Sequence, residues 1–402
     1  MTSGYKQTEV GVIPCDWLVR PVGLMGEVVT GKALAANAPG EQRPYLRTKN
    51  VFDGRVDIDD VLTMPMTDEQ FRQFMVKSGD VLLNEGQSLE LVGRCALYQD
   101  EYPELCAIQN QLLRFRARRG VSGVFASHLF RYCQQTGVFA RVALQTTSIA
   151  HLGGKRFEGL LLQWPSTDGE QRAIALALSD MDALLDGLER LITKKRDLKQ
   201  AVMQQLLSGQ TRLPGFRGEW EIKRLGDVAD IKTGSRNNED KIEDGEYPFF
   251  VRSDIVERIN TYSHDCEAIL VPGEGRIGDI FHYIKGRFDV HQRVYAITQF
   301  EPGMSAKFLH FYMAMRFGAW AMQNTVKATV DSLRLPTFQT FEMRVPPTKE
   351  EQTAIASVLI DMDAELTALE ARRDKTRDLK QAMMEELLTG KTRLVPVGDA
   401  RA

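Results

Sequence analysis

The sequence predicts an α/β protein in which two α/β domains are bridged by two long antiparallel coiled-coil helices, related as a pseudo-twofold internal repeat. Three observations predict this fold. One stretch of the chain recurs with more than half of its residues unchanged, each copy has the apolar spacing of a long helix, and each copy comes after a region of short strand-like runs and glycine turns. The 402 residues, 43% of them hydrophobic and 26% charged, suffice for two domains of ordinary size.

The repeat relates residues 165–213 to residues 346–394 at a constant offset of about 181 positions, with about 29 of 49 residues identical and no gap. The shared segments are Glu-Gln near the start, Asp-Met-Asp in the middle, Arg-Asp-Leu-Lys-Gln-Ala later on and Thr-Arg-Leu at the end. Chance does not produce agreement of this extent, so we expect two copies of one structural element.

Each copy has the signals of a single helix of about 40 residues, roughly 60 Å long. Thr167 with Glu170, and Thr348 with Glu351, have the capping-box spacing just after a proline. Glycine stands where a C-terminal cap is expected in each copy.

Apolar residues recur within each copy at steps of four and three, which is a heptad pattern. They are Ile174, Leu178, Met181, Leu185, Leu188 and Ile192 in the first copy, and Ile355, Leu359, Met362, Leu366 and Leu369 in the second. Two like seams in one chain most economically pack on each other, which predicts an antiparallel pair. The alternative is that each helix lies on its own domain and never meets the other.

The repeat divides the chain into four parts. We predict a first domain at residues 1–165, a central helix at 166–213, a second domain at 214–346, and a second helix with the tail at 347–402. The two domains correspond loosely where they begin and end, but they diverge almost completely between those points. A repeated framework therefore carries two different interiors.

Charge argues against a generic electrostatic nucleic-acid binder. The net charge is −3, and the first and second domains carry roughly +1 and −2, so neither is basic in bulk. Any contact with DNA must then come from local clusters or from charge supplied by partners.

Metal, disulfide and membrane sites are not indicated. The five cysteines are scattered without a Cys-x-x-Cys pair, and the six histidines are dispersed. No apolar run approaches the roughly 18–20 residues of a membrane span, and the first ten residues lack the apolar core of a signal peptide. We therefore expect a cytoplasmic protein that binds neither metal nor membrane.

The motifs of catalysis are also missing. The only consecutive prolines, Pro346-Pro347, do not form an adenine-methyltransferase motif, and there is no Gly-x-x-x-x-Gly-Lys-Ser/Thr loop for ATP. Residues 273–278 read Gly-Glu-Gly-Arg-Ile-Gly, the letters of a dinucleotide fingerprint. Residues 279–284 alternate like a strand, so no helix N-terminus would hold a pyrophosphate, and we expect a hairpin turn at the glycines.

Several segments resemble the specificity subunits of type I restriction–modification systems. They are the opening Ser3–Pro14, Tyr45–Val51, Gly79–Leu83 with Gly86, Glu246–Phe250, Ile269–Val271 with Gly275, and the Pro-x-x-x-x-Glu-Gln start of each helix. The resemblance covers essentially the whole chain. It implies a non-catalytic subunit whose two target-recognition domains each read one half of a bipartite, asymmetric site on double-stranded DNA, with the two helices fixing the spacing.

The same resemblance implies partners and cofactors. Two methyltransferase subunits would join the chain, one per recognition domain, and restriction subunits would complete the nuclease. S-adenosylmethionine and ATP with Mg²⁺ are expected on those partner subunits, and no cofactor is expected on this chain. A scaffold that joins two partners through its coiled coil without reading DNA is the alternative.

Base reading needs forked donors and amide side chains on exposed loops, and phosphate contacts add hydroxyl and cationic groups. In the first domain the candidates are Lys32, Arg47, Thr48, Lys49, Asn50, Gln109, Asn110 and Gln111. In the second domain they are Ser235, Arg236, Asn237, Asn238, Arg252, Ser253, Arg276, Gln292 and Arg293.

The shared Arg-Asp-Leu-Lys-Gln-Ala segment is the candidate for partner docking, because two like surfaces can receive two like subunits. Its residues are Arg196, Lys199 and Gln200 in the first copy, and Arg377, Lys380 and Gln381 in the second.

Overall fold

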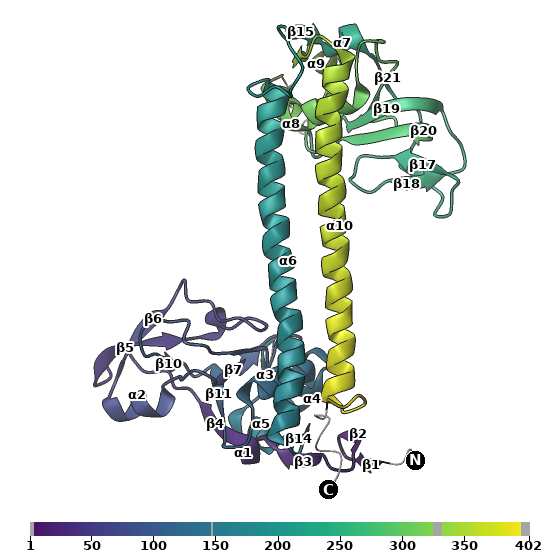
Figure 1. The fold of residues 1–402 in the computed structure, drawn as a ribbon. Helices are drawn as coiled ribbons and strands as arrows, with labels where there is room; N and C mark the ends of the chain where they lie inside the picture. The colour runs from purple at the N-terminus through teal and green to yellow at the C-terminus, as the bar shows by residue number, and fades with distance from the viewer. Residues whose placement is uncertain (1–3, 146–147, 325–331, 395–402) are drawn as a thin grey trace. The chain divides into compact units, whose positions relative to one another are not determined.

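The computed structural model describes residues 4–145, 148–324 and 332–394 (Figure 1). The chain forms two compact units, which we describe separately. Unit 1 is Met1–Leu188 with Arg372–Ala402, and unit 2 is Glu189–Ala371. The long helices α6 (Asp168–Ser208) and α10 (Lys349–Leu388) each contribute one part to each unit. The four-part division at residues 165, 213 and 346 stays a prediction.

Unit 1 mixes short strands and helices ahead of α6. Its strands are β1 (Tyr5–Thr8), β2 (Gly11–Pro14), β3 (Leu18–Pro21), β4 (Gly26–Thr30), β5 (Glu41–Leu46), β6 (Leu62–Met66), β7 (Val81–Asn84), β8 (Gly86–Gln87), β9 (Cys95–Leu97), β10 (Ala107–Ile108), β11 (Leu112–Ala117), β12 (Leu144–Gln145), β13 (Ala150–His151) and β14 (Leu161–Trp164). Its helices before α6 are α1 (Val22–Met25), η1 (Thr48–Asn50), α2 (Asp68–Phe74), α3 (Gly123–Gln135), α4 (Val138–Val142) and α5 (Gly154–Gly159).

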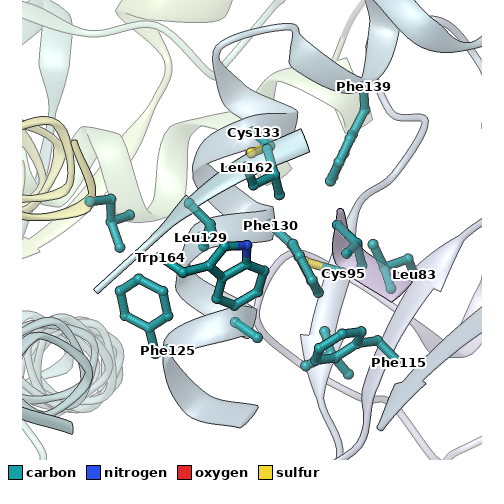
Figure 2. Close-up of a cluster of buried hydrophobic side chains, with 14 of the residues drawn as sticks. Leu83, Cys95, Phe115, Phe125, Leu129, Phe130, Cys133, Phe139, Leu162 and Trp164 are labelled. Carbon is teal, nitrogen blue, oxygen red and sulfur yellow. The ribbon is translucent and has the colours of Figure 1, made fainter. Parts of the chain in front are cut away.

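The central sheet of unit 1, in the order β4-β11-β7-β9, is covered on both faces. Side chains alternate across a strand, so Val81 and Leu83 of β7 join the cluster around α3, whereas Leu82 joins a second cluster with β5 and β6. Figure 2 shows the α3 cluster. Phe130 stands edge-on to Phe115 at 5.1 Å between ring centroids, an arrangement worth about 0.5–1.5 kcal/mol beyond burial.

Unit 2 is built on one larger sheet. Its strands are β15 (Glu221–Arg224), β16 (Asp230–Thr233), β17 (Tyr247–Phe250), β18 (Glu257–Ile259), β19 (His264–Pro272), β20 (His282–Val290), β21 (Val294–Thr298) and β22 (Glu342–Val345). Its helices besides α6 and α10 are α7 (Leu225–Val228), η2 (Asn238–Asp240), α8 (Ala306–Asn324) and α9 (Leu335–Gln339).

The six-stranded sheet of unit 2 runs β16-β21-β19-β20-β17-β18. In β19, Ile269 and Val271 pack into the cluster that contains α8, whereas Ala268 and Leu270 face a smaller cluster on the other side. Strands β19 and β20 pair antiparallel, so residues 273–281 connect a hairpin. The expected turn at the glycine-rich segment is confirmed, and the next element along the chain is the strand β20 and not a helix.

The long helices begin and end largely as predicted. The backbone N–H of Glu170 donates to Thr167 Oγ1 at 3.3 Å, and that of Glu351 to Thr348 Oγ1 at 3.4 Å. Gly209 and Gly390 have φ of 73° and 75°, the left-handed conformation of a helix C-cap. The heptad residues are buried or half-buried throughout both helices, as a packed seam requires.

The carboxylates of Glu170 and Glu351 do not complete capping boxes. Each accepts instead from an arginine that lies just beyond the end of the other helix, and each glutamate is almost completely buried. In unit 1, Arg393 donates to Glu170 at 2.5 and 2.8 Å. In unit 2, Arg212 donates to Glu351 at 2.5 and 2.6 Å.

The same reciprocity recurs further along the helices. Lys380 pairs with Asp182 in unit 1, and Lys199 pairs with Asp363 in unit 2. In an antiparallel pair each helix supplies one partner to each unit, so both copies must keep the carboxylates and the cations. This requirement explains why the repeated residues recur at the constant offset.

The glutamine of each Glu-Gln pair joins the helix to its own domain. Gln171 Oε1 accepts from Ser122 N at 2.9 Å, just before α3, and Gln352 Oε1 accepts from Ser305 N at 2.8 Å, just before α8. The predicted fold class, two α/β domains carried by two long antiparallel helices in an internal repeat, is therefore confirmed.

Candidate nucleic-acid interface

In unit 1 the candidate loops leave neighbouring strand ends. Strands β5 and β10 are parallel and in contact, and Gln109 N donates to Leu46 O at 2.9 Å. The loop after β4 approaches the same place, because a Cβ on Gly31 would lie 2.2 Å from Gln109 O. Lys32, Arg47–Asn50 and Gln109–Gln111 are thus brought together at one edge of unit 1.

Asn50 lies inside this edge and not on its surface. It is 1% exposed, and its Nδ2 donates to the carbonyls of Asp57 and Asp60 at 2.9 and 3.2 Å. Its Oδ1 accepts from Arg47 N at 3.0 Å. This burial contradicts the prediction that Asn50 contacts DNA bases. Its amide instead shapes the loop that holds Arg47 and Lys49.

Arg47 and Lys49 share one carboxylate. Their side chains lie 2.6 and 2.7 Å from Asp60 Oδ2. The hydrogen bond from Lys49 and the charge of Arg47 hold the pKa of Asp60 below its usual value. The cations of this loop are therefore neutralised within the chain.

Glu85 and His151 belong to the same edge, although no sequence motif marks either residue. Glu85 N donates to Gln111 O at 2.8 Å, and its carboxylate lies 3.0 Å from His151 Nδ1 and accepts from Gly153 N at 3.2 Å. His151 is half-exposed. The two residues are distant in sequence, so only folding joins them.

In unit 2 the candidates also converge. Arg252 and Arg293 both pair with Glu274 at 3.3 Å. The three residues lie in three separate loops. Arg276 pairs with Asp254 at 2.5 Å.

The loop after β16 joins this group. The backbones of Arg236 and His291 form an isolated parallel β-bridge, in which Gln292 N donates to Arg236 O at 2.8 Å. The side-chain amide of Gln292 donates to Asn237 Oδ1. Of the remaining candidates, Ser235 and Asn238 are exposed and Ser253 is half-buried. One edge of unit 2 therefore presents arginines, amides and hydroxyls from four loops.

A buried carboxylate supports this edge. Asp289 accepts from Thr261 Oγ1 at 2.7 Å, Ser263 Oγ at 2.8 Å and Arg236 Nε at 3.3 Å. Burial works to raise the pKa of Asp289, but these hydrogen bonds outweigh it and hold the pKa below 3.8. Asp289 stays ionised at neutral pH.

The docking candidates divide into two groups. Lys380 is 6% exposed, and it and the half-buried Lys199 are used in the ion pairs between the helices. These two lysines are therefore not free docking residues, which corrects the expectation. Arg196, Gln200, Arg377 and Gln381 are exposed, although Arg196 also pairs with Glu370 of the other helix and Arg377 with Asp374 of its own. Gln200 lines a hollow of about 340 Å³ with Met203 and Met315.

Metal ligands are not gathered anywhere in residues 4–145, 148–324 and 332–394, where no group of three or more His, Cys, Asp or Glu could hold an ion. Within the same ranges, none of the helices combines the length and apolarity needed to cross a membrane.

The family model and the relatives that match this chain carry similar descriptions. The family model described as the type I restriction modification DNA specificity domain matches residues 217–376. The putative type I restriction enzyme MjaX specificity subunit of Methanocaldococcus jannaschii is 23% identical over 428 residues, covering 97% of each chain. The EcoDI specificity subunit of Escherichia coli is 26% identical over 179 residues, covering 42% of this chain and 37% of that protein.

Solved structures share the fold. The crystal structure of the type I restriction–modification S subunit from M. genitalium matches with a TM-score of 0.61 at 15% identity, covering 96% of this chain and 99% of the other. That of the HsdS subunit from Thermoanaerobacter tengcongensis matches with a TM-score of 0.52 at 17% identity, covering 94% and 98%.

Proposed function

The chain belongs to the family of type I restriction–modification DNA-specificity subunits, and from this premise we propose that its two recognition domains each read one half of a bipartite, asymmetric DNA site. The role is non-catalytic: the chain supplies sequence specificity to an enzyme complex. In this proposal the target adenine is flipped out and methylated by a partner subunit.

One observation carries the proposal above the others. The helical framework is repeated with about 29 of 49 residues identical and with equivalent ion pairs, Glu170–Arg393 and Glu351–Arg212. The loops that hold the candidate DNA-contacting residues differ in sequence between the two units. A repeated frame with different loops suits a protein that reads two different sequences, because base-edge contacts depend on the side chains that each loop presents.

The proposal includes partners and cofactors. Two methyltransferase subunits would dock on the two copies of the framework, with Arg196, Gln200, Arg377 and Gln381 as candidate contacts, since like surfaces bind like subunits. Restriction subunits would join the complete complex. S-adenosylmethionine and ATP with Mg²⁺ would bind the partner subunits and not this chain, and the complex would act in the cytoplasm.

The test is methylation mapping in a host that lacks adenine methylation. We expect a bipartite, asymmetric motif only when this chain is expressed together with its methyltransferase. Replacing residues 1–165 with the corresponding part of another family member should change one half of the motif and leave the other half unchanged.

The control is the methyltransferase expressed alone. If its methylation pattern is the same with and without this chain, the chain does not supply specificity, and a scaffold role without DNA recognition would have to replace the proposal.

A further inference from the structure

Arg236 differs from the other arginines at the reading edge of unit 2. Its Nε donates at 3.3 Å to Asp289, which is 0% exposed. Arg276 pairs with Asp254, whose side chain is 59% exposed, and the carboxylate that Arg252 and Arg293 share is 23% exposed. An ion pair in water holds a side chain only weakly, so Arg236 has the firmest support of the four.

The backbone of Arg236 is fixed as well. Its N–H donates to Val290 O at 3.3 Å and its carbonyl accepts from Gln292 N at 2.8 Å. The chain can approach β20 this closely because residue 234 is glycine: a Cβ there would lie 1.9 Å from Val290 O. Both ends of the residue are therefore anchored to the end of one strand.

Asp289 is itself held in place. Thr261 and Ser263 each donate to one of its oxygens, and its own chain contributes the Val290 N–H at 3.0 Å. These hydrogen bonds fix the orientation of the carboxylate. The carboxylate therefore fixes the direction of the guanidinium that it binds.

The remaining nitrogens of Arg236 give the site its chemistry. The side chain is 39% exposed, and among the described residues its Nη1 and Nη2 have no hydrogen-bond acceptor. A guanidinium held at Nε presents two parallel donors outward. Guanine is the base whose major-groove edge offers two acceptors, O6 and N7, to such a fork.

We propose that Arg236 is a specificity-determining residue that reads a guanine in the second half-site, with Asp289 as its positioning residue. This inference rests on the proposed function. Adenine fits less well, because its N6 amino group is a hydrogen-bond donor and would face an N–H donor of the guanidinium. A phosphate would accept the same fork, but it requires no such fixed direction, and the more loosely held Arg276 suits that role.

The experiment uses the complete complex of this chain with its methyltransferase. Arg236→Met removes the fork and keeps the apolar stem, and Arg276→Met is the matched control at the same edge. Methylation mapping should show that Arg236→Met loses discrimination about tenfold or more at one guanine of the second half, with the first half unchanged. Arg276→Met should keep the motif and lower methylation at every site alike.

A second readout tests the contact without relying on one variant. The purified wild-type complex should bind about tenfold more weakly when that guanine alone is replaced by 7-deazaguanine, which lacks the N7 acceptor. The Arg236→Met complex should show no further loss with the modified base. Asp289→Asn should relax the same base position, because a neutral amide holds the guanidinium less firmly.

Two results would overturn the inference: an Arg236→Met motif that keeps every guanine, or equal losses for both complexes with the modified DNA. If the wild-type complex yields no bipartite motif at all, the proposed function fails instead.

Discussion

His128 lies in α3 with 5% of its surface exposed. Its Nε2 is 3.1 Å from Ser179 Oγ, and its Nδ1 is 3.9 Å from Asp182 Oδ2, without a hydrogen-bond partner among the described residues. Arg131 and Lys380 pair with the same carboxylate. Burial lowers the pKa of His128 from 6.5 to about 4, and the two neighbouring cations add to this effect against Asp182.

This burial predicts a pH dependence of stability. Because the folded pKa lies below the unfolded one, the unfolded chain binds more protons between pH 6.5 and 4. The contribution of His128 is complete above pH 6.5 and is lost as the pH falls toward 4, by about 3 kcal/mol in total. Urea unfolding between about pH 7 and pH 4.5 should show the slope.

His128→Gln should remove most of that slope, because the replacement does not titrate. The control is Gln135→Ala, at an exposed residue of the same helix that does not titrate, which should leave the slope unchanged. A slope that persists in His128→Gln would assign it to other groups.

At the scale of the element, α6 and α10 are stabilised by their seams and by ion pairs at their ends. Arg212 and Glu351 close one end of the pair in unit 2, and the guanidinium of Arg212 also lies 6.0 Å from the ring of Trp220. In unit 1, Arg393 makes the equivalent contacts with Glu170 and Trp17. The buried glutamates are therefore compensated only while the two helices are paired.

Removing one partner should be costly. Arg212→Met leaves the carboxylate of Glu351 buried and unpaired, and we expect a loss of about 3 kcal/mol in the free energy of unfolding. Chemical unfolding followed by circular dichroism would measure it.

Arg217→Met, at an exposed arginine nearby, is the matched control and should change stability by less than about 0.5 kcal/mol. Adding Glu351→Gln to Arg212→Met should recover part of the loss, because no buried charge then remains. Equal effects at Arg212 and Arg217 would show that the pair does not stabilise the helices.

For the whole molecule, the decisive property is that the arginines at its two candidate DNA-contacting edges are paired within the chain. The net charge is −3, and the candidate DNA-contacting arginines of both units pair with carboxylates, as in Arg47–Asp60 and Arg252–Glu274. Affinity for DNA comes mainly from cations that neutralise phosphates and release counterions. A chain whose reading-edge cations are mostly paired should therefore need a partner for tight binding.

We predict that the chain alone binds DNA in the non-specific range, with a Kd of about 10⁻⁴–10⁻⁶ M at physiological salt. Adding the methyltransferase should bring the Kd to about 10⁻⁸ M or below and steepen the salt dependence. Fluorescence anisotropy over a salt series would measure both, with a scrambled duplex as control. Tight, steeply salt-dependent binding by the chain alone would contradict the prediction.

The sequence by itself determined the repeat, the two long helices, their capping residues and the apolar seam. These features are local or periodic, so spacing along the chain reports them directly. It also identified the loops rich in Arg, Asn and Gln at which the strands of each unit end.

Only the tertiary structure decided what each polar residue does. It placed Asn50 inside its loop, used Lys199 and Lys380 between the helices, joined Glu85 to His151, and set Asp289 behind Arg236. Each role depends on a partner distant in sequence and on burial, which decides whether a charge must be paired. Neither quantity is periodic, so the pattern of residues cannot report it before the chain has folded.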